Sequence, residues 1–242
     1  MKIEYVPLLK IQRELYDIPR GTERFQTYIE TMVDPETRDL ELPLVAMNPM
    51  GKDHIPALLD QYLALTADDL AEQAVLAAAS QLTTIDGTFK LTLIIADDAM
   101  GWWTNRYTTE FGHCFESKPL FRRGWLTGLL WSSEPASAQT AQEAALSALF
   151  RGAYIQQNGF ARTLSEMLKQ EGYAMAHAGC TEPSLDPDDL AYTREILAPH
   201  FDSTDYAIII ASLFGDEAAR ELGYEPQGLS SRAGLALALH EE

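Results

Sequence analysis

The feature that most constrains the fold is a run of apolar residues that ends at two adjacent aspartates. Residues 89–96 alternate apolar and polar side chains at first and become wholly apolar towards their end, which is typical of a β-strand entering a protein core. Asp97 and Asp98 follow at once. The run therefore predicts a buried strand, in a sheet against which the helices of the chain pack.

Two further runs are candidate strands. Residues 124–132 are rich in aromatic and aliphatic side chains and predict a strand. Residues 206–214 are a third candidate, with a buried helix as the alternative, because periodicity does not separate a short buried strand from a buried helix. Helical spacing of apolar residues or local sequence predicts helices at residues 6–17, 22–32, 56–65, 67–82, 137–154, 163–179, 185–197 and 217–222.

Capping sequences support two of these helix starts. Thr163 and Glu166 have the spacing of a capping box. Thr66 and Asp69 have the same spacing, with aspartate in place of the usual glutamate or glutamine. Both pairs therefore predict that a threonine side chain binds the first turn of its helix.

The pattern as a whole predicts an α+β fold, with a small mixed or partly parallel sheet of about three or more strands packed by many helices. The N-terminal half is expected to be rich in helix. A length of 242 residues suits one globular domain, residues 1–242. A sub-boundary is expected near residues 84–88, between a helical N-terminal part and a sheet-containing part.

Composition narrows the class of partner. The formal net charge of −18 repels nucleic-acid phosphates and anionic lipids, so we expect neither nucleic acid nor membrane as a partner. The N-terminus lacks the continuous apolar segment of a signal peptide. Cys114 and Cys180 form no C-x-x-C or disulfide pattern, which favours a reducing cytoplasm.

Acidic and hydroxyl side chains follow each candidate strand. The three strand ends are Asp97-Asp98, Ser132-Ser133-Glu134 and Gly215-Asp216-Glu217. If the strands are parallel neighbours, these carboxylates converge at one sheet edge, where oxygen ligands suit Mg²⁺, Mn²⁺ or Ca²⁺. The alternative is that Ser133 or Ser137 and Asp216 simply cap the helices that follow.

The segment after Asp98 is dense in functional groups, and its backbone state is left open. In a helix, Arg106, Glu110 and His113 lie along one side, and the i,i+3 spacing lets Glu110 and His113 meet one metal. In a strand, Arg106 and Glu110 share a face and His113 moves to the other. In both states the aromatic side chains share one face: Trp103, Tyr107, Phe111 and Phe115.

Residues 47–54, with the sequence MNPMGKDH, are a second candidate region. A proline turn, a glycine and Lys52 precede a predicted helix, and a helix N-terminus with a nearby lysine can hold an anion. The alternative is an ordinary helix entry with Asp53 as the N-cap.

Several common active-site sequences are missing. The chain has no G-x-S-x-G nucleophile elbow, no H-E-x-x-H zinc sequence and neither of the glycine-rich phosphate-binding sequences. Cys114 follows His113 directly, so the two side chains do not face each other. Function must therefore be sought in residues that the fold brings together.

Our first hypothesis is a cytoplasmic enzyme or small-ligand-binding protein. Its candidate catalytic residues are Asp97, Asp98, Arg106, Glu110 and His113. The two aspartates would act as bases or metal ligands, Arg106 would orient an anionic group, and His113 would ligate metal or shuttle protons. The candidate ligands for a divalent Mg, Mn or Zn ion are Asp97, Asp98, Glu110 and His113.

The alternative hypothesis is a non-catalytic interaction or scaffold protein. On this view Trp102, Trp103 and Tyr107 form a surface patch for a protein partner, since two consecutive tryptophans cannot both face the core. The sequence leaves the substrate, the reaction and the oligomeric state open.

Overall fold

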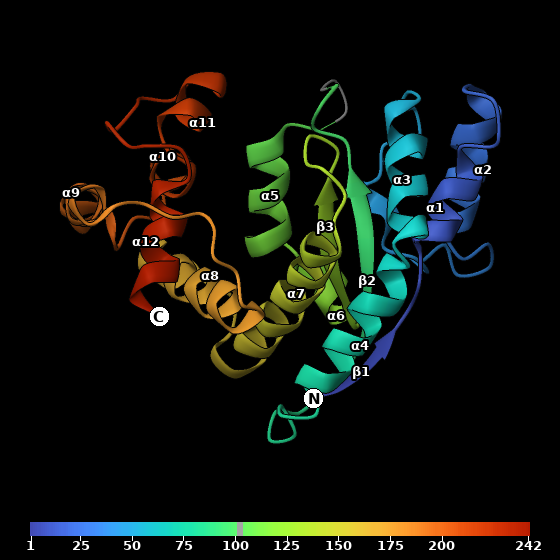
Figure 1. The fold of residues 1–242 in the computed structure, drawn as a ribbon, viewed down its shortest axis with the longest axis horizontal. Coiled ribbons are helices and arrows are strands. Elements are labelled where there is room, and N and C mark those ends of the chain that lie inside the picture. The colour runs from blue at the N-terminus through green and yellow to red at the C-terminus, as the bar shows by residue number, and fades with distance from the viewer. Residues whose placement is uncertain (101–103) are drawn as a thin grey trace. The chain divides into compact units, whose positions relative to one another are not determined.

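A three-stranded parallel sheet organises the first part of the chain in the computed structural model, which describes residues 1–100 and 104–242 (Figure 1). The strands are β1 (Lys2–Tyr5), β2 (Thr88–Ala96) and β3 (Trp125–Trp131), in the order β1-β2-β3. β2 is central, with Phe89 opposite Ile3 and Ala96 opposite Trp131. The predicted α+β class and the two predicted strands at 89–96 and 124–132 are confirmed.

The chain divides into two compact units. Unit 1 comprises Met1–Thr109 and Pro119–Leu149, and unit 2 comprises Glu110–Lys118 and Phe150–Glu242. Residues 84–88, where a sub-boundary was expected, fall inside unit 1. A single domain for residues 1–242 stays a prediction.

Unit 1 contains the sheet and the helices of the N-terminal half. These helices are α1 (Leu9–Leu15), α2 (Thr22–Met32), the 3-10 helix η1 (Leu44–Ala46), α3 (His54–Ala64) and α4 (Ala67–Ala79). The α6 helix (Lys118–Arg122) precedes β3. Three helices contribute residues to both units: α6, through Lys118, α5 (Arg106–Phe115) and α7 (Ala138–Asn158).

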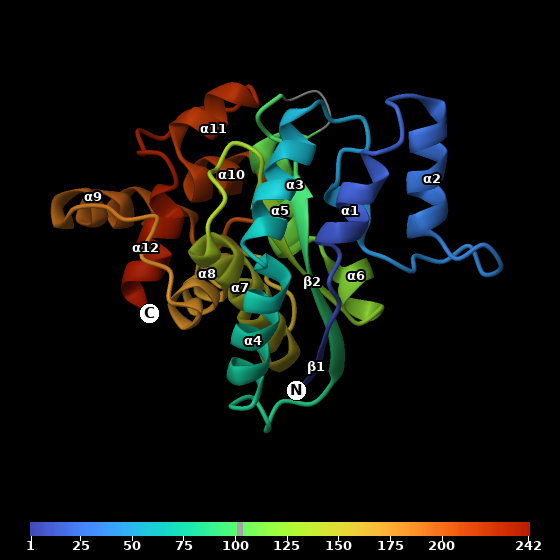
Figure 2. The same ribbon diagram turned by 45° about the vertical axis from the view of Figure 1, so that its right-hand side comes forward.

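Helices pack on the sheet at close range. Figure 2 shows α3 and α4 as a column that runs alongside the strands. α7 approaches β3 at Gly128, where an added Cβ would lie 2.6 Å from the backbone oxygen of Ala144. Glycine at this position therefore sets the distance between α7 and the sheet.

Where β1 ends, a glutamine side chain takes its place as the hydrogen-bonding partner of the β2 backbone. β1 pairs with β2 only as far as Leu91. Beyond that point Gln12, which is fully buried, donates from Nε2 to the Leu93 oxygen at 3.0 Å. Its Oε1 accepts a hydrogen bond from the Ile95 nitrogen at 2.9 Å. The carboxamide thus satisfies backbone groups that a longer β1 would otherwise pair.

Unit 2 is helical. Its helices are α8 (Leu164–Ala178), α9 (Pro187–Leu197), the 3-10 helix η2 (Ala198–His200), α10 (Tyr206–Phe214), α11 (Asp216–Glu221) and α12 (Ala233–Glu241). The prediction of a third strand at 206–214 is wrong, because this segment is α10. Asp205 begins the helix by accepting a hydrogen bond from the Ile208 nitrogen at 3.1 Å. The segment is apolar because it is a buried helix, the alternative noted above.

The two predicted capping boxes have different outcomes. Thr163 and Glu166 form the predicted reciprocal box at the start of α8. Thr66 does not cap α4, because its backbone is left-handed with φ of 50° and its side chain makes no cap hydrogen bond with any residue that the structure describes. The second prediction is therefore wrong.

α8 and α12 pack closely in unit 2. A Cβ added at Gly172 in α8 would lie 2.5 Å from the Ala238 oxygen in α12. The absence of a side chain at Gly172 therefore lets the two helix backbones approach each other.

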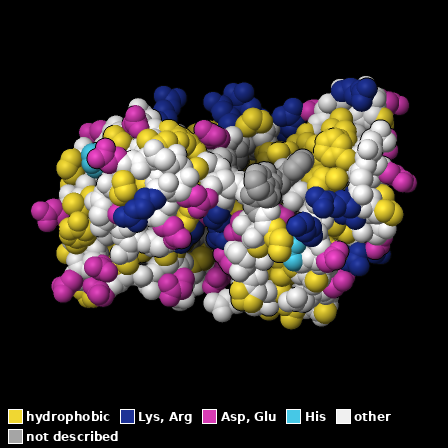
Figure 3. All heavy atoms as spheres, turned by 90° about the horizontal axis from the view of Figure 1, so that it is seen from above, with side chains coloured by type: hydrophobic (Ala, Val, Ile, Leu, Met, Phe, Trp, Pro, Cys, Tyr) yellow, Lys and Arg dark blue, Asp and Glu magenta, His cyan; other side chains and the backbone are white. Residues whose placement is uncertain are grey.

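The surface carries charges of both signs. Lys and Arg side chains and Asp and Glu side chains both appear on the face seen from above (Figure 3). No helix within residues 1–100 or 104–242 is long and apolar enough to cross a membrane.

Candidate functional site

β2 delivers two adjacent carboxylates to the carboxyl edge of the sheet, at the top of Figure 1. Consecutive side chains of an extended chain point to opposite sides. Accordingly, Asp97 contacts His54 at the start of α3, and Asp98 contacts Arg106 at the start of α5. Ser132 and Ser133 follow β3 and reach the same carboxylates. The ends of β2 and β3 therefore meet at one edge of the sheet, as the sequence predicts for parallel neighbouring strands.

Asp97 is 2% exposed, and three side-chain donors surround its carboxylate. Asn48 Nδ2 donates to Oδ2 at 2.7 Å, and His54 Nε2 and Ser132 Oγ approach Oδ1 at 2.8 and 3.0 Å. Burial alone would raise the pKa of Asp97, but these hydrogen bonds outweigh it and hold the pKa below its ordinary value of 3.8. Asp97 is therefore ionised at neutral pH and acts only as an acceptor.

An ionised Asp97 fixes the proton on the imidazole of His54. Nε2 must carry hydrogen to donate to the carboxylate, so in the neutral ring Nδ1 holds the lone pair. Nδ1 is buried and has no hydrogen-bond partner among the residues that the structure describes. Leaving such a group unpaired costs about 1–3 kcal/mol, so this atom requires an explanation. The side chain as a whole is 22% exposed, but Nδ1 itself is not among its exposed atoms.

The loop that carries Asn48 and His54 is the second region marked by the sequence. Two candidate regions, 47–54 and the end of β2, are therefore one site. Asp53 occupies the predicted N-cap position of α3, but its side chain makes no cap hydrogen bond within the described ranges. Sequence reasoning missed His54 and Asn48 as site residues, although it singled out their loop.

Asp98 is bound differently, by a cation and a backbone group. Arg106 Nη1 donates to Oδ2 at 2.8 Å, and Ser133 donates to Asp98 from its nitrogen at 2.9 Å and its Oγ at 2.7 Å. Burial alone would raise the pKa of Asp98. The hydrogen bonds from Arg106 and Ser133 have the larger effect and hold the pKa below its ordinary value. Arg106 also pairs with Glu134 at 2.7 Å and lies 4.1 Å from the centre of the Trp131 ring. Its charge is thus committed to two carboxylates, and the predicted anion-orienting role stays a prediction.

Ser132 ties the two aspartates together. Its Oγ accepts hydrogen bonds from the nitrogens of Asp98 and Ala99, both at 3.0 Å. Its single hydroxyl hydrogen is shared between Asp97 Oδ1 at 3.0 Å and Asp98 Oδ1 at 3.2 Å. A hydroxyl with both its lone pairs and its hydrogen engaged is a poor nucleophile, so Ser132 shapes the site instead.

The other two predicted site residues belong to unit 2. The helical alternative for residues 103–116 is confirmed from Arg106 onwards, and α5 carries Glu110 and His113. Glu110 forms a bidentate ion pair with Arg232, at 2.5 and 2.9 Å. Among the described residues, no group of three or more His, Cys, Asp or Glu side chains is placed to hold a metal ion. The metal centre at Asp97, Asp98, Glu110 and His113 therefore stays a prediction.

Asp216 does not join the strand ends as expected, because the segment before it is a helix. It lies in unit 2, where Oδ1 accepts hydrogen bonds from three consecutive backbone nitrogens, those of Gln227, Gly228 and Leu229, at 2.9–3.0 Å. Its side chain makes no cap hydrogen bond to the described part of α11. Both sequence interpretations of Asp216 are therefore wrong, and the carboxylate anchors a turn.

The alternative hypothesis rests on aromatic residues, of which the structure describes those from Tyr107 onwards. Trp102 and Trp103 lie outside the described residues. Phe111 and Phe115 contact each other along α5, with ring centres 5.2 Å apart, as the predicted stripe requires. Tyr107 is half-buried. The surface patch for a protein partner stays a prediction.

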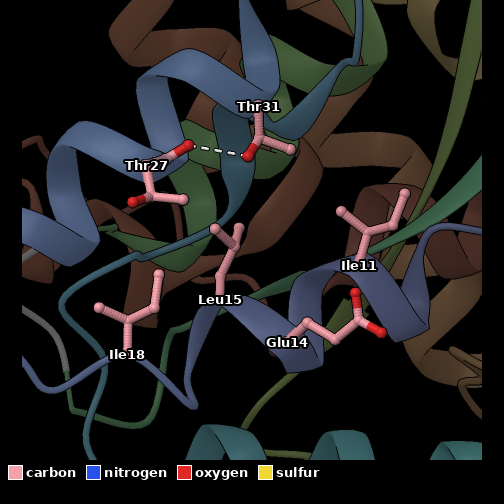
Figure 4. Close-up of a pocket in the computed structure, with 6 residues that line it drawn as sticks. All are labelled: Ile11, Glu14, Leu15, Ile18, Thr27 and Thr31. Atoms are coloured by element: carbon pink, nitrogen blue, oxygen red, sulfur yellow. Dashed lines mark hydrogen bonds between the residues drawn. The ribbon is translucent and has the colours of Figure 1, made fainter.

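A cavity of about 240 Å³ lies between α1 and α2 (Figure 4). Its lining is mostly apolar with two threonines and a glutamate, namely Ile11, Glu14, Leu15, Ile18, Thr27 and Thr31. The Thr31 hydroxyl is already bound to the Thr27 oxygen at 2.8 Å. This lining offers no pair of groups suited to acid–base chemistry.

The site at the sheet edge therefore consists of an imidazole oriented by a buried carboxylate, beside an arginine clamped between two acids. No family model matches the chain, and neither a curated protein nor a solved structure shows a match.

Proposed function

We propose that the protein is an enzyme that uses His54 as a general base, with Asp97 orienting and stabilising the imidazole. The observation that carries this proposal is the 2.8 Å hydrogen bond between His54 Nε2 and Asp97 Oδ1. This bond leaves Nδ1 as a lone pair without a partner in the described chain. Such a lone pair can accept a proton from a substrate or from water once a movement of the loop before His54 exposes it.

The chemistry follows from the protonation states. His54 Nδ1 takes a proton from water or a substrate hydroxyl as the oxygen of that group attacks an electrophilic carbon. The bond to the leaving group then breaks, and the imidazolium returns the proton to the departing oxygen or sulfur. The imidazolium so formed keeps its Nε2 hydrogen bond to the Asp97 carboxylate, whose negative charge stabilises it. Ser132 is engaged by Asp97 and Asp98, so the proposed attack uses water or a substrate group instead of a covalent serine intermediate.

Charge indicates the class of substrate. The described side chains of the site include three carboxylates, Asp97, Asp98 and Glu134, against the single guanidinium of Arg106. This excess of negative charge disfavours anionic ligands and favours neutral or cationic ones. We therefore propose hydrolysis of a neutral or cationic small molecule, without nucleic-acid or membrane partners. Cys114 and Cys180 form no disulfide with each other, which favours a reducing cytoplasm as its location.

The test compares the full-length protein with H54Q on three model esters. The probes are neutral p-nitrophenyl acetate, cationic acetylthiocholine and anionic p-nitrophenyl phosphate. We expect the neutral and cationic esters to be hydrolysed, with rates about 10²–10⁴-fold lower in H54Q, and the anionic one to be disfavoured. H177Q removes an exposed histidine of unit 2 and should keep the wild-type rate. Equal rates in wild type and H54Q would contradict the proposal.

A further inference from the structure

Arg24 carries a buried positive charge next to the loop that leads into the candidate site. This α2 residue is 7% exposed and forms no ion pair with a carboxylate in the described part of the chain. Its guanidinium instead contacts four backbone oxygens. Nε donates to Ile18 at 2.7 Å, and the terminal nitrogens lie 3.4–3.5 Å from the oxygens of Tyr16, Pro49 and Gly51. Burying a cation without a counter-ion is costly, so the arrangement needs a compensating role.

The four oxygens belong to two separate segments, the end of α1 and the loop at residues 48–51. Tyr16 reinforces the same junction, because its hydroxyl donates to the Asn48 oxygen and its ring lies 5.1 Å from the guanidinium carbon of Arg24. The loop is tightly packed there. A Cβ added at Gly51 would lie 2.8 Å from Ile55 Cγ1 and 3.1 Å from the Tyr16 hydroxyl. Arg24 and Tyr16 thus fix the loop from one side.

The other side of that loop forms the candidate site. Asn48 sends its side chain to Asp97, and the chain continues directly into His54 at the start of α3. The Asp53 side chain gives α3 no cap within the described residues, so the position of His54 depends on the loop before it. Two of the three donors to Asp97 are therefore held in place through contacts made by Arg24.

We infer that Arg24 is a positioning residue for the His54–Asp97 pair. It touches neither side chain of the pair and acts through the 48–51 loop. The functional meaning of this role rests on the proposed general-base function. The geometry itself predicts that loss of Arg24 releases Asn48 and His54 together, and that the imidazole then loses its fixed proton position.

The experiment uses the full chain labelled with ¹⁵N-histidine, and reads the ring nitrogens of His54 by NMR. H54Q assigns its signals among the five histidines. We expect wild type to carry the proton on Nε2. In R24Q, His54 should show a mixture of both tautomers, and the amides of Gly51 and Ile55 should exchange at least about tenfold faster. R13Q removes another unit 1 arginine, one bound to exposed carboxylates, and should change neither measurement.

R24K covers the case in which R24Q fails to fold. Lysine keeps the charge but cannot reach both segments with one nitrogen, so the same changes should appear at smaller size. Wild-type ring signals and exchange rates in a folded R24Q, or in R24K if R24Q does not fold, would overturn the inference alone. A wild-type His54 with its proton on Nδ1 would instead overturn the proposed function.

Discussion

Asp97 and Asp216 are both buried and ionised, but they are bound in opposite ways. Asp216 accepts three hydrogen bonds from consecutive backbone nitrogens of one turn. Asp97 is bound by three side chains from separate parts of the chain, Asn48, His54 and Ser132. Asp216 also pairs with Arg220 at 3.1 Å, a guanidinium that stays charged, whereas Asp97 is paired with an imidazole that can exchange a proton near neutral pH. The first arrangement stabilises a turn, and the second can also move a proton.

The largest expected effect is on stability, at the turn of unit 2. Asp216→Ala leaves three backbone N–H groups without their common acceptor and should lower the free energy of unfolding by about 3 kcal/mol. Urea denaturation followed by circular dichroism measures this loss. The ¹⁵N signals of His54 should not change in this variant. A stability within 0.5 kcal/mol of wild type, on the scale of an ordinary surface substitution, would show that the turn does not need its anchor.

Asp97→Asn should have a smaller effect on stability and a larger one on chemistry. The amide cannot serve all three donors, so we expect a loss of about 1–2 kcal/mol. The His54 ring should move its proton to Nδ1 to accommodate the amide, which removes the base. Ring NMR and ester hydrolysis check both points, with Asp216→Asn as the matched control. Retention of the wild-type tautomer in Asp97→Asn would break the comparison between the two aspartates.

Acid should remove the stabilisation that three hydrogen-bonded carboxylates give to the fold. The folded-state pKa values of Asp97, Asp98 and Asp216 are lowered, because hydrogen bonds overcome the opposing effect of burial. Their stabilisation is therefore complete above the ordinary pKa of 3.8 and is lost as pH falls through the lower folded values. Unfolding measured from pH 6 to pH 2 should show stability falling below about pH 4. Asp97→Asn and Asp216→Asn should each flatten this dependence, and unchanged curves would contradict the assignment.

The smallest effect is expected at the rim of the site. Glu134 is partly exposed and pairs with Arg106, which Asp98 also holds. Glu134→Gln should therefore change the free energy of unfolding by less than about 1 kcal/mol, as for other exposed ion pairs. It should also reduce the preference for cationic over neutral esters. A loss of stability as large as that of Asp97→Asn would show that the clamp on Arg106 is part of the structural framework.

Local sequence patterns predicted the parts of the fold that local physics decides. The alternation before Asp97 and the aromatic run before Ser132 identified β2 and β3, and Thr163 with Glu166 identified the start of α8. β1 was missed because four residues are too few to establish a period. The α10 segment was misassigned because a fully buried helix is apolar all round, as a buried strand is, and only Asp205 marked its start.

The sequence predicted only some of the residues of the candidate site. Asp97, Asp98 and Arg106 stood out because charged side chains directly follow a buried strand. His54 and Asn48 lie more than 40 residues before Asp97, and no spacing rule joins a loop to a strand end at that distance. Glu110 suited a metal site by spacing along a helix, but its bidentate partner Arg232 lies 122 residues further along the chain. Long-range pairing of this kind comes from packing and leaves no local pattern.

The carboxamide of Gln12 has a consequence for colloidal behaviour. An unpaired stretch of strand backbone is a template on which another chain can add, and such addition begins many forms of aggregation. Because Gln12 occupies the oxygen of Leu93 and the nitrogen of Ile95, this stretch of β2 offers no free ladder to a second molecule. A single internal amide thereby removes one template for strand addition from a sheet whose first strand has four residues.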